Sequence, residues 1–276
     1  MTRHPHAGDS RHTQRALPPQ DPQSLQAAQD TERTQRVKAV RPEQPARHAP
    51  AIPPALHTLN PGDSRYPLAL ERWRDWCEGD GLFNDATPLA CLGDLAPLQR
   101  PTLGLLCSAH CPGSVLLETF RFVRAATPES PTFIGGFHSP MERTCLDTLL
   151  VRHVPVIFCP GRRLHTRSVP ASWRPAIADG RLLLLSPFSE RQKRVDRGLA
   201  RLRNAFVVAL ADSLFVPYAR PGGSVLALVS AALRKGKRVI TLDDPENGPL
   251  VRMGAERLEV GELIQRYCLR PAAGSA

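Results

Sequence analysis

A glycine-rich turn, Pro-Gly-Gly-Ser at residues 221–224, contains the residue types of an anion-binding site. Gly222 and Gly223 lack a Cβ, so the backbone can turn sharply there and a ligand can approach it closely. Ser224 is a good N-cap for the apolar helix that we expect from Val225 onwards, and a helix N-terminus attracts anions through its free N–H groups and its dipole. The same residues would also make a plain tight turn with a cap, so the turn alone leaves both interpretations open.

The turn lies inside a predicted strand-helix-strand unit. An apolar run at 213–216 precedes it, the apolar helix is stopped by Gly236, and a β-branched run at 239–241 follows. Two short parallel strands joined by a helix form a right-handed crossover, and such units build sheets that are covered on both faces.

The rest of the chain repeats this alternation. Apolar runs typical of buried strands alternate with segments whose apolar residues fall at helical spacing. The pattern predicts an α/β fold with a doubly wound, mostly parallel sheet. The expected strands are 102–108, 132–134, 155–158 and 182–185, and the expected helices include 115–125, 141–153 and 258–267.

Four loops follow predicted strands, at residues 108–114, 135–140, 160–167 and 219–224. Ligands of doubly wound sheets bind outside the carboxyl ends of the strands, where such loops gather. Glycines, hydroxyls and basic side chains in these loops suit a phosphate-binding cleft. The candidate residues are Ser108, Gly135, Gly136, Arg162, Arg163, Gly222, Gly223 and Ser224.

A basic segment at 188–204 precedes the glycine-rich unit. It contains Lys193, Arg194 and Arg203, and positions 194, 197 and 201 share one helical face. A solvated helix face explains this pattern as well as a polyanion groove does; the neighbouring glycine loops favour the groove. Three aromatic residues, Phe137, Phe188 and Tyr218, are the best placed to stack on bases.

Composition predicts a protein that binds a polyanion. The 276 residues carry 36 Lys and Arg against 26 Asp and Glu, a formal net charge of +10, which favours nucleic acid, nucleotides or an anionic surface. No apolar run is long enough for a membrane span and no secretory signal is visible, so we expect a cytoplasmic protein. We predict a disordered polar tail at 1–55, a helical lead-in at 56–100 and the α/β domain at 101–270.

The seven cysteines do not predict a metal site. They are scattered through apolar segments, as buried reduced thiols are, and Cys107 and Cys111 have no second pair at zinc-binding spacing. We therefore expect neither a metal nor a cofactor.

Several blocks, in order, resemble the DNA-processing protein family, DprA or Smf. Arg203-Asn204 followed by 209–212 is similar to the family's Arg-Asn-Arg helix that ends in Leu-Ser-Asp. The turn at 223–226 resembles its Ser-Gly-Ser-Leu, and 248–255 its closing Gly-Thr-Asn-x-Leu-Ile-x-x-Gly-Ala. Further matches are 92–95, Ser108 within 105–108, Gly136 within 135–137, and 186–188.

The resemblance implies a Rossmann-like domain that binds single-stranded DNA in a basic groove and helps to load a recombinase. Arg203, Asn204 and the glycine loops would line that groove. Two family arginines are missing, one of them replaced by Ala109, so Arg162, Arg163, Lys193 or Arg194 would supply phosphate contacts. We expect no C-terminal winged helix after the helix 258–267. A homodimer is possible, but the sequence does not determine the oligomeric state.

Catalysis is not expected. The related nucleotide hydrolases of the LOG type have a Pro-Gly-Gly-x-Gly-Thr-x-x-Glu pattern, whereas here Val229 stands in the place of the acid. Of two other carboxylates, Glu118 and Glu142, the second falls early in a predicted helix, where the dipole favours an acid anyway. The alternative to DNA binding is a sensor that holds a nucleotide in the same loops.

Overall fold

The computed structural model describes residues 55–70, 87–189 and 195–269. Lys193 and Arg194 lie outside the described residues, as do nearly all of the predicted tail at 1–55 and part of the predicted lead-in at 56–100. The described residues all belong to one compact unit.

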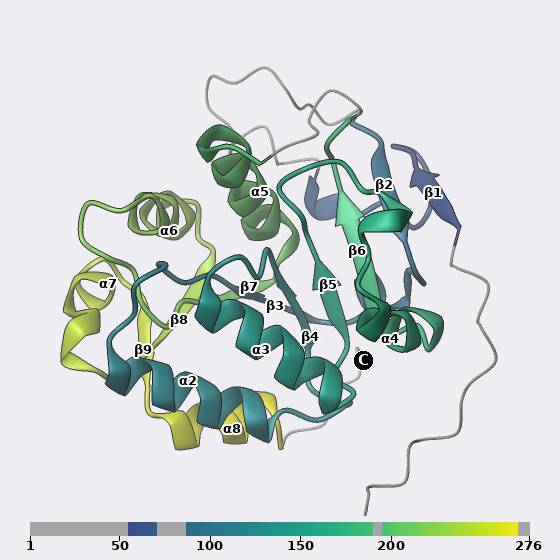
Figure 1. The fold of residues 1–276 in the computed structure, drawn as a ribbon. Helices are drawn as coiled ribbons and strands as arrows, with labels where there is room; N and C mark the ends of the chain where they lie inside the picture. Colours follow the sequence, from purple (N-terminus) through teal and green to yellow (C-terminus); the bar gives the residue numbers. More distant parts are fainter. Residues whose placement is uncertain (1–54, 71–86, 190–194, 270–276) are drawn as a thin grey trace, which may run out of the picture. The chain divides into compact units, whose positions relative to one another are not determined.

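The described residues contain a nine-stranded sheet, shown in Figure 1. Its order is β1-β2-β6-β5-β4-β3-β7-β8-β9. The strands from β6 to β9 are parallel, while β2 is antiparallel to β6 and β1 to β2. The strands are β1 (Leu56–Leu59), β2 (Leu89–Leu92), β3 (Thr102–Leu105), β4 (Thr132–Gly135), β5 (Val156–Phe158), β6 (Leu182–Ser186), β7 (Ser213–Phe215), β8 (Arg238–Leu242) and β9 (Glu256–Leu258).

The sheet is doubly wound around β3. From β3 the chain proceeds through β4 and β5 to β6 on one side, and then returns to build β7, β8 and β9 on the other side. This confirms the predicted α/β, mostly parallel fold. The helices are α2 (Gly113–Ala125), α3 (Pro140–Val151), α4 (Arg174–Ala178), α5 (Arg197–Leu210), α6 (Ser224–Arg234), α7 (Gly248–Arg252) and α8 (Val260–Tyr267). None of the helices in the described ranges is both long and apolar enough to cross a lipid bilayer.

Two hydrophobic cores lie on opposite faces of the sheet because successive strand residues point in opposite directions. In β4, Phe133 packs with α2, α3 and α8, whereas its neighbour Ile134 packs with α5 and α6. In β7, Phe215 belongs to the same core as Phe133, and Leu214 belongs to the same core as Ile134. The near-continuous apolar runs of the sequence follow from this burial on both faces.

Gly104, in the middle of β3, lets α5 end close against the sheet. A Cβ there would lie 2.7 Å from Leu214 Cδ2 and 2.9 Å from Ala211 Cβ, both closer than side-chain atoms approach. Asp212, just after α5, accepts hydrogen bonds from the backbone N–H and the hydroxyl of Thr102 at 2.7 and 2.9 Å. The C-terminal end of α5 is therefore held at the start of β3.

Three strands were not predicted. β1 and β2 pair antiparallel at one edge, and β9 adds a three-residue parallel strand at the other. The structure also corrects the start of α6, because Ser224 is its first residue and Gly223 its N-cap. The boundaries predicted for the three regions of the chain stay a prediction.

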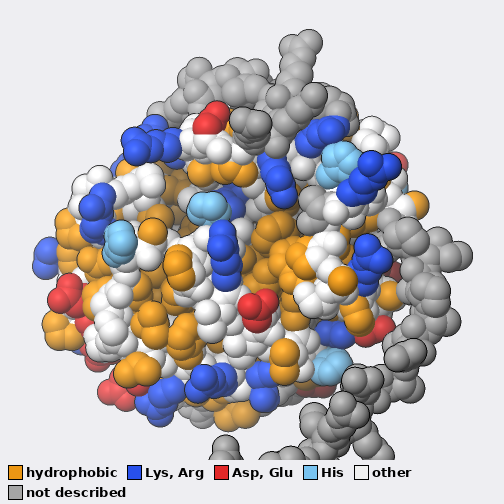
Figure 2. All heavy atoms as spheres, in the orientation of Figure 1, with side chains coloured by type: hydrophobic (Ala, Val, Ile, Leu, Met, Phe, Trp, Pro, Cys, Tyr) orange, Lys and Arg blue, Asp and Glu red, His pale blue; other side chains and the backbone are white. Residues whose placement is uncertain are grey.

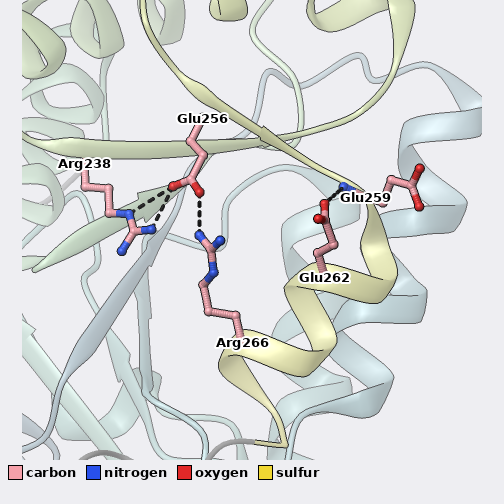
Figure 3. Close-up of polar contacts among 5 residues, drawn as sticks. All are labelled: Arg238, Glu256, Glu259, Glu262 and Arg266. Atoms are coloured by element: carbon pink, nitrogen blue, oxygen red, sulfur yellow. Dashed lines mark hydrogen bonds and ion pairs between the residues drawn. The ribbon is translucent and has the colours of Figure 1, made fainter.

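An ion-pair network joins the edge of the sheet to α8, as Figure 3 shows. The Glu256 carboxylate accepts hydrogen bonds from Arg238 of β8 at 2.8 Å and from Arg266 of α8 at 2.6 Å. Glu262 caps the same helix by accepting a hydrogen bond from the Glu259 N–H at 3.0 Å. The hydrogen bond from Arg266, and then that from Arg238, hold the pKa of Glu256 below its usual range.

Glu256→Gln should lower the free energy of unfolding at neutral pH by less than about 1 kcal/mol, because solvent screens these partly exposed pairs. A carboxyl group whose pKa is lowered by folding stabilises the protein above the pKa of the unfolded chain, and that contribution disappears as the pH falls through the pKa of the folded state. The difference between the two proteins should therefore shrink on acidification, measured by urea unfolding at several pH values. A difference that grows towards acid pH would contradict this assignment.

Candidate functional site

The carboxyl ends of the central parallel strands lie side by side at one edge of the sheet. Leu105, the last residue of β3, pairs with Gly135 of β4 and with Phe215 of β7, and Gly135 pairs with Phe158 of β5. The loops that follow these strands therefore gather at the same edge, as predicted. The direction of winding reverses between β3 and β7, which is where doubly wound sheets bind ligands.

A cavity of about 420 Å³ opens at this reversal, and we call it the switch-point pocket. The loop after β3, the start of α3, the middle of α5 and the N-terminus of α6 surround it. Its lining includes Ser108, His138, Arg203, Asn204, Arg220 and Gly223.

A second cavity of about 630 Å³ lies beside it, over the ends of β4 and β5, and we call it the aromatic pocket. Phe137, Phe158 and Trp173 form one wall: the rings of Phe137 and Phe158 are stacked with centroids 6.3 Å apart, and Trp173 meets Phe158 edge-on at 5.0 Å. Gly136, Arg162 and Arg203 also line this pocket.

Arg203 lies between the two pockets and lines both. The residue is only 6% exposed. Its Nε donates to Asn204 Oδ1 at 2.7 Å and one terminal nitrogen lies 3.5 Å from the Cys159 carbonyl. A guanidinium group carries five N–H donors, so the remaining N–H groups have no partner among the described residues. Burial lowers the pKa of Arg203, and the nearby Glu142 carboxylate opposes that shift.

Gly136 makes room for this buried guanidinium. A Cβ at position 136 would overlap the terminal nitrogen and the central carbon of the Arg203 guanidinium. The glycine is therefore needed because the Arg203 side chain approaches its backbone, whereas the sequence predicted only that Gly136 lines a phosphate-binding cleft.

Glu142 holds together the loops after β3 and β4. Its Oε1 accepts a hydrogen bond from the Cys107 N–H at 3.0 Å, and its Oε2 accepts from the N–H groups of His138 and Ser139 at 2.9 and 3.0 Å. Ser139 in turn caps α3 by accepting from the Glu142 N–H at 3.2 Å. This buried carboxylate thus occupies three backbone donors of the loops that follow β3 and β4.

The N-terminus of α6 keeps its donors, because no side chain caps it. The preceding loop is fixed to the loop after β3: Ser108 Oγ accepts from the Arg220 N–H at 2.9 Å, and the Ser108 N–H donates to the Tyr218 carbonyl at 3.0 Å. The Gly223 N–H donates to the Arg220 carbonyl at 2.9 Å. The helix end and the Arg220 side chain therefore give the switch-point pocket its positive rim.

The predicted site residues that the structure describes divide into three groups. Five of them line the switch-point pocket, namely Ser108, Arg203, Asn204, Gly223 and Ser224, and three line the aromatic pocket, namely Gly136, Arg162 and again Arg203. Gly135, Arg163 and Gly222 line neither of these two pockets. Gly135 ends β4, and Gly222 adopts a φ of +70° in the turn before α6.

Sequence reasoning missed most of the aromatic wall. Phe188, expected to stack on bases, is 3% exposed and packs against Leu199 and Leu202 of α5. The sequence does not indicate that Phe158 or Trp173 contacts a ligand. Phe158 lies in a predicted strand, and Trp173 lies in a linker between predicted elements. Glu142 could have been found from its capping-box spacing, Ser-x-x-Glu at 139–142.

No group of three metal-ligating side chains exists among the residues that the structure describes. The six cysteines in that part of the chain are free thiols. A hydrogen bond between Cys107 and Cys111 raises the pKa of Cys107, which burial raises further, and lowers the pKa of Cys111.

The fold is that of DNA processing protein A. The chain aligns with the DprA structure from Streptococcus pneumoniae at a TM-score of 0.59 and 16% identity, over 76% of this chain and 74% of that one. It aligns with DprA from Helicobacter pylori, a protein described as binding single-stranded DNA, at a TM-score of 0.58 and 18% identity, over 76% of this chain and 94% of that one. No family model matches the sequence, and the curated proteins contain no match to it.

Removing the Glu142 carboxylate should destabilise the fold. Glu142→Ala leaves three backbone N–H groups at 107, 138 and 139 without their acceptor, which should cost roughly 1–3 kcal/mol in the free energy of unfolding. Glu118→Ala is the matched control, because that carboxylate is partly exposed and pairs with Arg121 on the same helix; surface changes of this kind cost about 0.5 kcal/mol or less. Equal losses for the two variants in urea unfolding would refute the bracing role of Glu142.

Proposed function

We propose that this protein binds single-stranded DNA at the carboxyl edge of its parallel sheet. The observation that carries the proposal is the buried, half-satisfied guanidinium of Arg203, which faces both pockets at this edge. A desolvated cation with free N–H donors is suited to a phosphate group. The DprA fold supports the choice of ligand, since the H. pylori protein with this fold binds single-stranded DNA.

The charge around the pockets agrees with a phosphate backbone. Exposed Arg143 and Arg162 border the aromatic pocket, and exposed Arg220 borders the switch-point pocket. In Figure 2, Lys, Arg and His side chains are spread across the upper half of the visible face, with few carboxylates among them. A strand that follows this edge would meet a cation at each pocket.

The proposal contains no catalytic step. The Glu142 carboxylate at the pocket edge is already bound by three backbone N–H groups, which leaves it poorly placed to move a proton. We place the protein in the cytoplasm, in keeping with the free thiols of its described cysteines. The recombinase partner, the nucleotide ligand and the homodimer stay predictions.

Fluorescence anisotropy with a labelled oligonucleotide, as single strand and as duplex, tests the proposal across a salt titration. The wild-type protein should prefer the single strand. Arg162→Ala combined with Arg220→Ala should weaken binding and reduce the slope of log affinity against log salt by about 0.7 for each phosphate that is no longer neutralised. Arg121→Ala, an exposed arginine on α2, is the control and should change neither. Equal affinity for single strand and duplex, or a double variant that binds as the wild type does, would refute the proposal.

Gly136→Ala tests Arg203 without removing it. The new Cβ displaces the guanidinium, which is the far end of a flexible side chain, while the backbone at 136 needs no positive φ. Single-strand affinity should fall several-fold with little change in thermal stability. Gly261→Ala is the matched control, because a Cβ there meets nothing within 4 Å. Unchanged affinity of Gly136→Ala would show that the position of the guanidinium does not matter for binding.

A further inference from the structure

The aromatic pocket has the shape and lining of a site for one flat ring. Its volume of about 630 Å³ lies within the range of small-ligand pockets. Trp173 and Phe158 are half-buried, and both line the cavity. In Figure 2, exposed hydrophobic surface lies between basic side chains on this face.

The backbone supporting the aromatic wall is strained. Phe137 adopts a φ of +43°, in the left-handed region that side chains other than glycine rarely occupy. Its ring is 3% exposed and stacks on Phe158. Strained residues of this kind are held by the surrounding structure and cluster at binding sites. Here the strained backbone stacks the Phe137 ring on Phe158, which lines the cavity.

Three charged side chains of the aromatic pocket, two arginines and one aspartate, lack a partner among the described residues. Arg143 and Asp147 lie one turn apart on α3, and Arg162 lines the same pocket from the loop after β5. The side chains of all three, and the indole N–H of Trp173, form no hydrogen bond or ion pair with another described residue. Arginines beside a flat apolar wall suit a phosphate backbone with an attached base, while a carboxylate accepts hydrogen bonds from a base edge.

We propose that the aromatic pocket takes one nucleobase of the bound single strand, stacked on Trp173 beside Phe158, and that Asp147 makes it prefer guanine. This inference rests on the proposed function. Arg203 lines both pockets, so the phosphate beside the inserted base reaches the same guanidinium as the strand in the switch-point pocket. Guanine presents two adjacent N–H donors to a carboxylate, whereas thymine presents one donor between two acceptors.

Anisotropy with three oligonucleotides tests the pocket: oligo-dT, oligo-dT with one internal guanine, and oligo-dT with one abasic site. Wild-type protein should bind the guanine-containing strand most tightly. Trp173→Ala should weaken the binding of the guanine-containing strand roughly tenfold, as loss of one stacked base does. The slope of log affinity against log salt should not change, because no charge is removed. Trp173→Phe should retain most of the affinity, and Asp147→Asn should abolish the preference for guanine over thymine.

Phe120→Ala, a half-buried aromatic of α2 outside both pockets, is the control for lost packing, and thermal midpoints verify that each variant is folded. If wild-type protein binds all three strands equally and Trp173→Ala binds like wild type, the base pocket is refuted while the single-strand site stands. If wild-type protein binds no single strand, the proposed function itself is refuted.

Discussion

The three hydrogen bonds to the Glu142 carboxylate are the constraint on which the binding edge depends. They join the loop after β3 to the loop after β4 and to the first turn of α3, so the walls of both pockets share one buried support. In many α/β proteins the backbone donors at this point face a ligand phosphate. Here the Glu142 carboxylate occupies them. A phosphate at this edge would therefore be bound by Arg203 and by the uncapped N-terminus of α6.

Most of the fold could be predicted because its central strands are buried on both faces. Such strands are short apolar runs, and the helices between them show a 3.6-residue repeat, so local pattern alone reveals the alternation. The edges could not be predicted in this way. β9 is three residues long, and the antiparallel pairing of β2 with β6 joins segments about ninety residues apart, which no local pattern encodes.

The candidate site was only partly predictable. Glycine turns and basic residues are visible in sequence, and loop convergence follows from the topology, so Arg203, Gly223 and Ser224 were found. The burial of Arg203 and the role of Gly136 depend on how closely α5 packs over β4, which residue types do not show. The aromatic wall was missed for a similar reason: Phe158 and Trp173 belong to different elements and meet only in the folded chain.

The contact between Gly136 and Arg203 also restricts how this sequence can change over evolutionary time. A side chain at 136 excludes the guanidinium from its place, and a shorter residue at 203 leaves an empty space above the glycine. A substitution at either position alone should therefore weaken the binding of single-stranded DNA. We expect the two residues to be inherited as a pair. Among distant relatives that have lost most other sequence similarity, joint retention or joint replacement of this pair would mark which lineages keep the charged edge.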